Sequence, residues 1–260
     1  MTLTQQQILQ VETVLRNSLR HKFQNYNPEP AAMPFHTRLL GKDRMALFSF
    51  IHSLNTNFGT SIFEPVAKAL ASFTFASAES QQIAGNQISS EAQRVIQNIM
   101  DRLTVATSSP NKIEEINAIR AVCQAGEMKT VKPTKVDIKL VGYDGTIYLI
   151  DLKTAKPNAG GFKEFKRTLL EWVATTFAAN PTANVQTIIA IPYNPYEPQP
   201  YNRWTMRGML DLDNELKVAA EFWDFLGGQG AYTDLLDIFE RIGLELRPEI
   251  DAYFTRYNRQ

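Results

Sequence analysis

Two aspartates and a lysine in the middle of this 260-residue sequence have types and a spacing suited to phosphate chemistry. Thirteen residues separate Asp137 from Asp151, and Lys153 follows two positions later. Two carboxylates held close together repel each other unless a cation or a proton lies between them. Oxygen ligands with open coordination positions suit Mg²⁺, and a lysine beside the ion can orient an attacking water. If the three side chains meet, the implied chemistry is metal-dependent hydrolysis of a phosphodiester.

A β-hairpin is predicted to position these side chains. Two β-branched and apolar runs, 136–141 and 146–152, flank a turn-forming segment at 142–145. A three-residue loop at 143–145 would pair Asp137 with Asp151, and Gly145 would supply the left-handed conformation of the third loop position. A two-residue loop would shift the pairing by one residue and turn Asp137 to the opposite face. We therefore expect the three-residue loop if the site is functional.

The same residues also allow a plainer interpretation. Two aspartates and a lysine in a hairpin commonly form a solvated face with a cross-strand salt bridge. The spacing alone is common among proteins and does not decide between the two interpretations. Deciding between a catalytic site and a solvated face requires evidence from other segments of the chain.

Further segments of the sequence resemble those of a known family. Asp137 with the run 151–153 (Asp-Leu-Lys) resembles the PD-(D/E)xK nuclease signature, although Val136 stands where the superfamily name has proline. The following run 154–162 (Thr-Ala-Lys-Pro-Asn-Ala-Gly-Gly-Phe) resembles one group of type II restriction endonucleases, which cuts the palindrome GGNCC. Segments 63–67, 191–196 and 201–204 are similar to the same group. The resemblance spans roughly residues 55–245.

The resemblance implies an α/β fold of the α+β type, a restriction-endonuclease-like core with a central mixed sheet flanked by helices. The predicted hairpin, the helix 162–178 and a buried strand at 185–191 lead to the same outline, because a strand, a crossover helix and a strand form a parallel unit. Regions 1–110 and 211–260 are expected to be mainly helical additions to a nuclease core at 111–210, in one compact domain. Helices are expected at 4–23, 43–58 (ended by Gly59), 62–75, 90–105, 112–124, 214–226, 233–242 and 248–257, with a polar surface loop at 77–90.

The resemblance also implies roles for the site residues. Mg²⁺, for which Mn²⁺ can substitute, would be held by Asp137, Asp151 and the backbone carbonyl of Leu152, and Lys153 would position and activate water. Glu64 falls in the first turn of a predicted helix, where a carboxylate favours the helix dipole. The functional alternative is that the Glu64 side chain points into the metal site and acts there as an outer ligand.

Three segments are expected to contact double-stranded DNA. The loop 157–161 and Lys156 could hold a phosphate, although a simple strand-to-helix turn explains the loop equally well. The proline-rich stretch 192–204 favours DNA contact through a stiff loop, and a packed structural loop is the alternative. Arg203, in that stretch, and Arg207, just after it, could read guanine in the major groove. The third segment is the helix 162–178, whose basic residues outside the apolar face could reach the DNA backbone. The candidate DNA-binding residues are Lys156, Asn158, Lys163, Lys166, Arg167, Tyr193, Asn194, Tyr201, Arg203 and Arg207.

Composition narrows the class of protein. The formal net charge is zero, but residues 129–170 contain nine Lys or Arg and four Asp or Glu, so basic charge gathers around the predicted hairpin. No apolar run is long enough to span a membrane, and the start of the sequence lacks the pattern of a secretory signal. The single cysteine, Cys123, suits a reducing cytoplasm and is expected to be buried.

The sequence therefore predicts a cytoplasmic, homodimeric type II restriction endonuclease that hydrolyses double-stranded DNA. A two-fold dimer matches a palindromic site. A cognate methyltransferase is expected in the same system, without a stable complex. Two alternatives stay open: a repair or recombination nuclease of the same fold that recognises DNA structure, and a catalytically silent DNA-binding domain.

Overall fold

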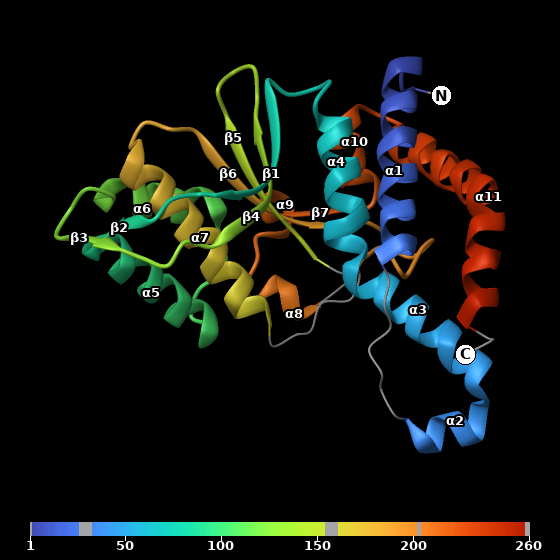
Figure 1. Ribbon diagram of the computed structural model, residues 1–260. Helices are drawn as coiled ribbons and strands as arrows, with labels where there is room; N and C mark the ends of the chain where they lie inside the picture. Colours follow the sequence, from blue (N-terminus) through green and yellow to red (C-terminus); the bar gives the residue numbers. More distant parts are fainter. Residues whose placement is uncertain (1, 26–32, 154–160, 202–203, 258–260) are drawn as a thin grey trace.

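The computed structural model describes residues 2–25, 33–153, 161–201 and 204–257 (Figure 1). A central β-sheet lies between two layers of helices, and a smaller two-stranded sheet lies beside one layer. The helices are α1 (Gln5–Asn25), α2 (Pro34–Leu40), α3 (Lys42–Phe58), the π-helical turn η1 (Gly59–Phe63), α4 (Glu64–Ala71), α5 (Ser90–Thr104), α6 (Lys112–Val122), α7 (Phe162–Ala179), α8 (Trp204–Arg207), α9 (Leu212–Glu215), α10 (Ala220–Gly227) and α11 (Ala231–Tyr257). The strands are β1 (Ser77–Ile83), β2 (Gln87–Ser89), β3 (Met128–Thr130), β4 (Lys135–Val141), β5 (Ile147–Leu152), β6 (Val185–Ile191) and β7 (Leu216–Val218).

Across the described residues, the central sheet has five strands in the order β1-β4-β5-β6-β7. Strands β1, β4 and β5 pair antiparallel, whereas β5, β6 and β7 pair parallel. A parallel pair needs a long crossover, and α7 provides it between β5 and β6. The predicted mixed sheet flanked by helices is confirmed. Strands from residues 1–110 and 211–260 join those of 111–210 in this one sheet.

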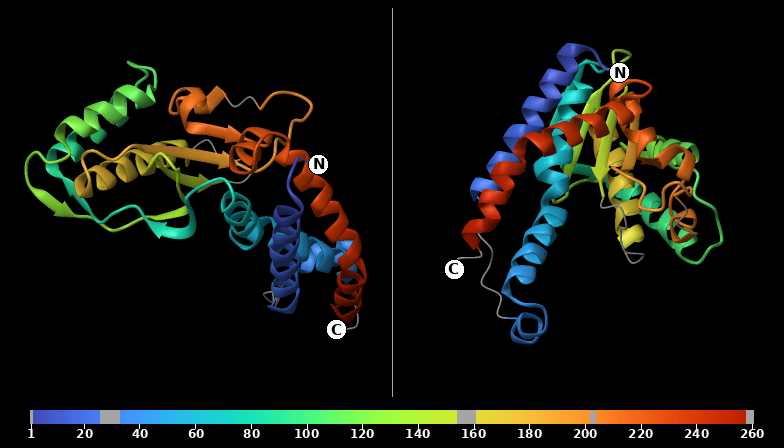
Figure 2. Two further views of the ribbon diagram at one scale, coloured as in Figure 1. Left: turned by 90° about the horizontal axis from the view of Figure 1, so that it is seen from above. Right: turned by 90° about the vertical axis from the view of Figure 1, so that its right-hand side faces the viewer.

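Each face of the sheet is covered by its own helical layer (Figure 2). Successive strand residues point to opposite faces, so a strand buried on both sides can serve two cores. Ile150 and Ile188 belong to the core shared with α1, α4, α10 and α11. Leu149 and Ile189, one residue away, belong to the core shared with α5, α6 and α7. The hairpin is therefore held rigidly from both sides.

The hairpin has the predicted register. Cα partners Ile138–Ile150 and Val141–Ile147 place Asp137 one step beyond the last paired rung, opposite Asp151. Gly145 has φ of +82°, and its N–H donates to the Gly142 carbonyl at 2.9 Å. A residue with a Cβ is disfavoured in this conformation, so the glycine selects the three-residue loop that fixes the register.

Two expectations for the N-terminal half were wrong. The polar run 77–90 was expected to be a surface loop, but it forms β1 and β2. Strand β1 is the edge of the central sheet, where an alternation of half-buried and exposed polar side chains is sufficient. Gly59 was expected to end a helix, yet its φ of −54° and ψ of −67° are right-handed helical. The chain instead continues through η1 directly into α4.

Two expectations for the C-terminal region were also wrong. The segment 214–226 was expected to be one helix, but it contains the edge strand β7 between α9 and α10. The breaks expected at Gly243 and Pro248 do not occur, and α11 runs through both residues. Leu246 and Ile250 pack into the same core on either side of Pro248, so tertiary burial offsets the cost of an interior proline. Among the described helices, none combines the length and apolar character that a bilayer crossing requires.

Candidate active site

The predicted chemical residues lie where β5 ends and β4 begins, beside the first turn of α4 (Figure 1). The Lys153 ammonium lies 2.7 Å from Asp151 Oδ1. The backbone N–H of Leu152 donates to Asp137 Oδ2 at 2.8 Å. The carboxylate of Asp137 thus takes the place of a backbone acceptor at the end of the β4–β5 ladder. The structure therefore brings Asp137, Asp151 and Lys153 together as the register predicted.

The electrostatics of Asp151 indicate a shortage of positive charge. Burial raises the pKa of Asp151 to about 7 even though Lys153 opposes the rise, and the negative charge of Asp137 and its hydrogen bond with Asp151 raise it further. Only 7% of Asp151 is exposed. A carboxyl group in this state is stabilised by any cation that enters beside it. The donor chemistry of the site therefore fits a divalent metal ion.

Glu64 also faces this site. It lies in the first turn of α4 and is buried, and Gln81 Nε2 donates to its Oε2 at 2.8 Å. Burial raises the pKa of Glu64, the hydrogen bond from Gln81 lowers it, and the charge of Asp137 raises it. Glu64 is thus electrostatically coupled to Asp137 and is not simply a surface acid at a helix N-terminus.

Gln81 is a site residue that sequence reasoning missed. Its Nε2 also approaches Asp137 Oδ1 at 3.4 Å, so one amide lies between two carboxylates. The run 77–83 (Ser-Ala-Glu-Ser-Gln-Gln-Ile) has no apolar alternation that would have marked it as a strand. Without that strand, nothing in the sequence placed Gln81 opposite Asp137.

The set of possible metal ligands is small. Within the described ranges, no group of three or more His, Cys, Asp or Glu side chains could together hold an ion. Asp137, Asp151 and the Leu152 carbonyl could hold an ion together with water and phosphate oxygens. Mg²⁺ commonly binds through one or two carboxylates in this way.

Lys153 is held from two directions. Besides its ion pair with Asp151, its ammonium lies 4.6 Å from the centre of the Phe165 ring on α7. A cation over an aromatic face is attracted by the ring quadrupole. The first turns of α7 therefore help to fix the orientation of Lys153.

The predicted DNA-binding residues fall into separate groups. Lys156, Asn158 and Arg203 lie outside the described residues. Lys163 and Arg207 are exposed on α7 and α8. The Arg167 guanidinium donates to Gln97 Oε1 at 2.8 Å, and Tyr193 is half-exposed. DNA contact by these residues stays a prediction.

Asn194 and Tyr201 have structural contacts within their loop. Asn194 Nδ2 donates to the Gln199 carbonyl at 2.7 Å, and its Oδ1 accepts from the Tyr196 N–H at 2.9 Å. The rings of Tyr196 and Tyr201 lie 5.8 Å apart. These contacts favour the packed-loop alternative for Asn194 and Tyr201.

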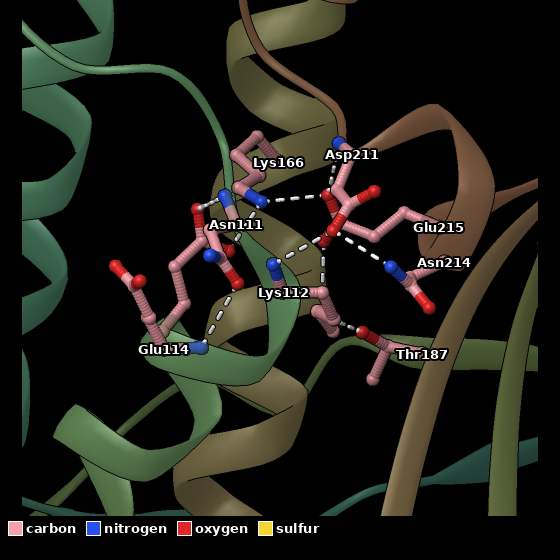
Figure 3. Close-up of polar contacts among 9 residues, drawn as sticks. Asn111, Lys112, Glu114, Lys166, Thr187, Asp211, Asn214 and Glu215 are labelled. Carbon is pink, nitrogen blue, oxygen red and sulfur yellow. Dashed lines mark hydrogen bonds and ion pairs between the residues drawn. The ribbon is translucent and has the colours of Figure 1, made fainter.

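The expectation that Lys166 reaches DNA was wrong. Lys166 is fully buried and its Nζ donates to Glu215 Oε2 at 2.7 Å and to Glu115 (Figure 3). Nearby, Lys112 Nζ donates to Glu215 Oε1 at 2.9 Å and to Thr187. We call Lys112, Glu115, Lys166 and Glu215 the buried ion cluster. It ties α6, α7 and α9 to the sheet and leaves Lys166 no access to a phosphate.

A mixed sheet between two helical layers, with an Asp…Asp-x-Lys set at the carboxyl end of a central strand, defines the core of a PD-(D/E)xK nuclease. Comparison with known proteins is in agreement. Residues 3–243 match the family described as "HinfI: Type II restriction endonuclease, HinfI". The chain belongs to this family and is a type II restriction endonuclease. Enzymes of this kind are site-specific deoxyribonucleases, act on DNA and generally use a divalent metal ion.

Individual relatives cover most of the chain. The type II restriction enzyme HgiEI of Herpetosiphon aurantiacus is 28% identical over 222 residues, which is 84% of this chain and 79% of the relative. HgiBI of the same organism is 25% identical over 260 residues, covering 93% and 90%. MjaII of Methanocaldococcus jannaschii is 26% identical over 226 residues, covering 82% and 59%. The predicted resemblance to type II restriction endonucleases is confirmed.

Proposed function

We propose that this enzyme hydrolyses phosphodiesters of double-stranded DNA in a Mg²⁺-dependent reaction, as a homodimer acting on a palindromic site. GGNCC is the site implied by the sequence resemblance. One observation carries the proposal: Asp137, Asp151 and Lys153 converge at the end of the hairpin, and the buried Asp151 has an elevated pKa that a bound cation would relieve.

The roles follow from the contacts of each residue. Asp137, Asp151 and the Leu152 carbonyl would hold the ion, with Glu64 as an outer group linked to Asp137 through Gln81. When bound, the ion would stabilise charge on the phosphoryl oxygens and lower the pKa of a bound water. Lys153, held between Asp151 and the Phe165 ring, would donate a hydrogen bond to the attacking water and stabilise developing negative charge.

Digestion of a plasmid with Mg²⁺, followed by run-off sequencing of the ends, tests the activity. We expect discrete fragments whose ends share one short palindromic sequence, with one cut in each strand. Smeared products, or cuts only at junctions, would instead support a structure-specific nuclease. No cutting with Mg²⁺ or Mn²⁺ would support a silent DNA-binding domain.

The exposed face of α2 and α3 supports the homodimer. These helices project from the body in Figure 1 and in the right-hand view of Figure 2. No residue of α2 is buried, although the segment is largely apolar. The exposed apolar side chains together offer on the order of 600 Å², close to the roughly 800 Å² that each partner buries in a standard interface. They are Phe35, Leu39, Leu40, Leu47, Phe48 and Ile51.

A second copy is the occupant we propose for this face, because each chain carries one site and a palindrome needs two. Changing Phe35 and Leu39 together to serine should weaken the dimer at least about 100-fold, as truncation of interface anchors does. Light scattering during gel filtration measures this. Ile113→Ser, at another exposed apolar position on α6, is the control. A double variant that stays dimeric would place the interface elsewhere.

Two further proposals, a cellular location and a companion enzyme, follow from the restriction activity. A restriction endonuclease works on DNA that enters the cell, so we propose a cytoplasmic location. We also propose a cognate methyltransferase that protects the host sequence without forming a stable complex with this chain.

A further inference from the structure

The backbone of Gln81 is strained at the edge of the site. Its φ of +55° lies in the left-handed region, which non-glycine residues seldom adopt. The β1–β4 register is the same on both sides of it, with Ser80 opposite Ile138 and Gln82 opposite Val136. No residue has been inserted, so the strain is confined to the one position that faces Asp137.

The side chain at this position has specific partners. Gln81 Nε2 donates to Glu64 Oε2 at 2.8 Å and lies 3.4 Å from Asp137 Oδ1. A primary amide has two N–H groups, so it can serve two acceptors. Glycine would remove the backbone strain at this position but would also remove the amide. Strained residues that persist are concentrated at functional sites.

An amide differs from a cation at this point. A lysine here would neutralise Glu64 and Asp137 and compete with a metal ion. The neutral amide restrains the two carboxylates without reducing their negative charge. It also acts on the oxygen of Asp137 that the Leu152 N–H does not bind, because Leu152 bonds to Oδ2 and Gln81 approaches Oδ1. The carboxylate plane of Asp137 is therefore fixed from two sides.

We propose that Gln81 is a positioning residue of the metal site, an inference that rests on the proposed function. Its amide links Glu64 to Asp137 and orients the Asp137 carboxylate for an ion shared with Asp151. Its strained backbone is retained because this orientation requires a side chain with an amide. Gln81 acts through Asp137 and is not itself a ligand.

Two substitutions separate this role from a structural one. Gln81→Gly removes both the amide and the strain, whereas Gln81→Ala removes the amide and keeps the strain. We expect both variants to bind Ca²⁺ about 10- to 100-fold more weakly, the usual effect of losing a group that orients a metal ligand. We expect the melting temperature without metal to be higher for the glycine variant than for wild type, and no higher than wild type for the alanine variant.

The measurement is calorimetric titration of Ca²⁺ into each protein bound to a short duplex carrying the mapped cleavage site. Single-turnover cleavage is then followed over a range of Mg²⁺ concentrations, where both variants should need more Mg²⁺ than wild type. Gln82→Ala is the matched control, since the Gln82 amide donates to the Ser80 carbonyl and not to the site. This control should behave as wild type.

The possible outcomes are distinct. Wild-type Ca²⁺ affinity and Mg²⁺ dependence in both variants would overturn the role of Gln81. So would a loss of affinity accompanied by a lower melting temperature in the glycine variant, because that pattern marks a structural residue. Asp151→Asn is assayed alongside: if it cuts as wild type does, the proposed site itself fails. If Asp151→Asn is inactive while both Gln81 variants bind Ca²⁺ and depend on Mg²⁺ as wild type does, the inference about Gln81 fails alone.

Discussion

Two groups of charged side chains in this enzyme each contain buried carboxylates but differ in charge balance. The buried ion cluster contains two lysines and two glutamates, and each lysine Nζ contacts a carboxylate (Figure 3). The second group, which we call the catalytic group after its proposed role, contains Glu64, Asp137 and Asp151, with Lys153 paired to Asp151. The first group has equal numbers of positive and negative side chains, whereas carboxylates outnumber lysines in the second.

The pKa shifts of the two groups show the consequence. Burial alone would raise the pKa of Glu215, but Lys112 and Lys166 bring it below its ordinary value. Burial raises the pKa of Asp151 to about 7, because Lys153 alone does not compensate and Asp137 adds repulsion. The pKa of Glu115, in the same buried ion cluster, is raised by burial although Lys166 opposes the rise, so the contrast is between Asp151 and Glu215 and not between every carboxylate of the two groups. The raised pKa of Asp151 is consistent with the proposal that it accepts a cation, whereas Glu215 is already neutralised by two lysines.

Breaking the balanced cluster should give the largest loss of stability. Lys166→Met keeps the length of the side chain but leaves Glu115 and Glu215 with too little positive charge. We expect a loss of about 3–5 kcal/mol in the free energy of unfolding, the usual cost of breaking a buried ion pair. Denaturant titration measures it. Lys163→Met, on an exposed face of the same helix, should change stability by less than about 0.5 kcal/mol.

Removing the lysine of the catalytic group should affect activity more than stability. Asp151 can take up a proton when Lys153→Met removes its partner, and Lys153 is partly exposed, so we expect stability to change by less than about 1 kcal/mol. The single-turnover cleavage rate should fall about 10²- to 10³-fold, as for loss of one donor to transition-state charge. A variant that cuts normally would remove Lys153 from the mechanism. Lys129→Met, exposed on β3, is the control.

The metal-free enzyme should also show a pH dependence of its stability. The pKa of Asp151 is about 7 in the folded chain and near 3.8 when unfolded, so the folded state binds this proton more tightly. The associated stability is complete below about pH 4 and is lost as pH rises through 7. Asp151→Asn lacks this loss, so in EDTA it should exceed wild type in unfolding free energy at pH 8 and lose that advantage toward pH 4. Parallel curves for the two proteins would contradict the burial of Asp151.

The hairpin was predictable because its determinants are local. Alternating apolar residues fix which face is buried, and Gly145 selects the loop that sets the register. The crossover to β6 followed from the length of α7 and the apolar run at 185–191. These three features were sufficient to bring Asp137, Asp151 and Lys153 together.

The errors came from contacts between distant segments. Lysine is a surface residue by type, and Lys166 is buried only because Glu115 and Glu215 arrive from α6 and α9. Strand β1 has a polar sequence that pairs because β4 offers it an edge, so Gln81 was not placed at the site. Strand β7 was hidden within a helix-like pattern for the same reason. Contacts between segments that are far apart in the sequence leave no recognisable pattern within a short stretch of residues.

The central claim is that Asp151 belongs to the catalytic metal centre, and Asp151→Asn tests it most directly. Plasmid cleavage with Mg²⁺ is measured beside specific binding to a duplex carrying the mapped site, with Asp237→Asn on the exposed face of α11 as the control. The account predicts that Asp151→Asn abolishes cleavage, keeps specific binding largely intact and leaves the control fully active. Undiminished cleavage by Asp151→Asn would contradict it.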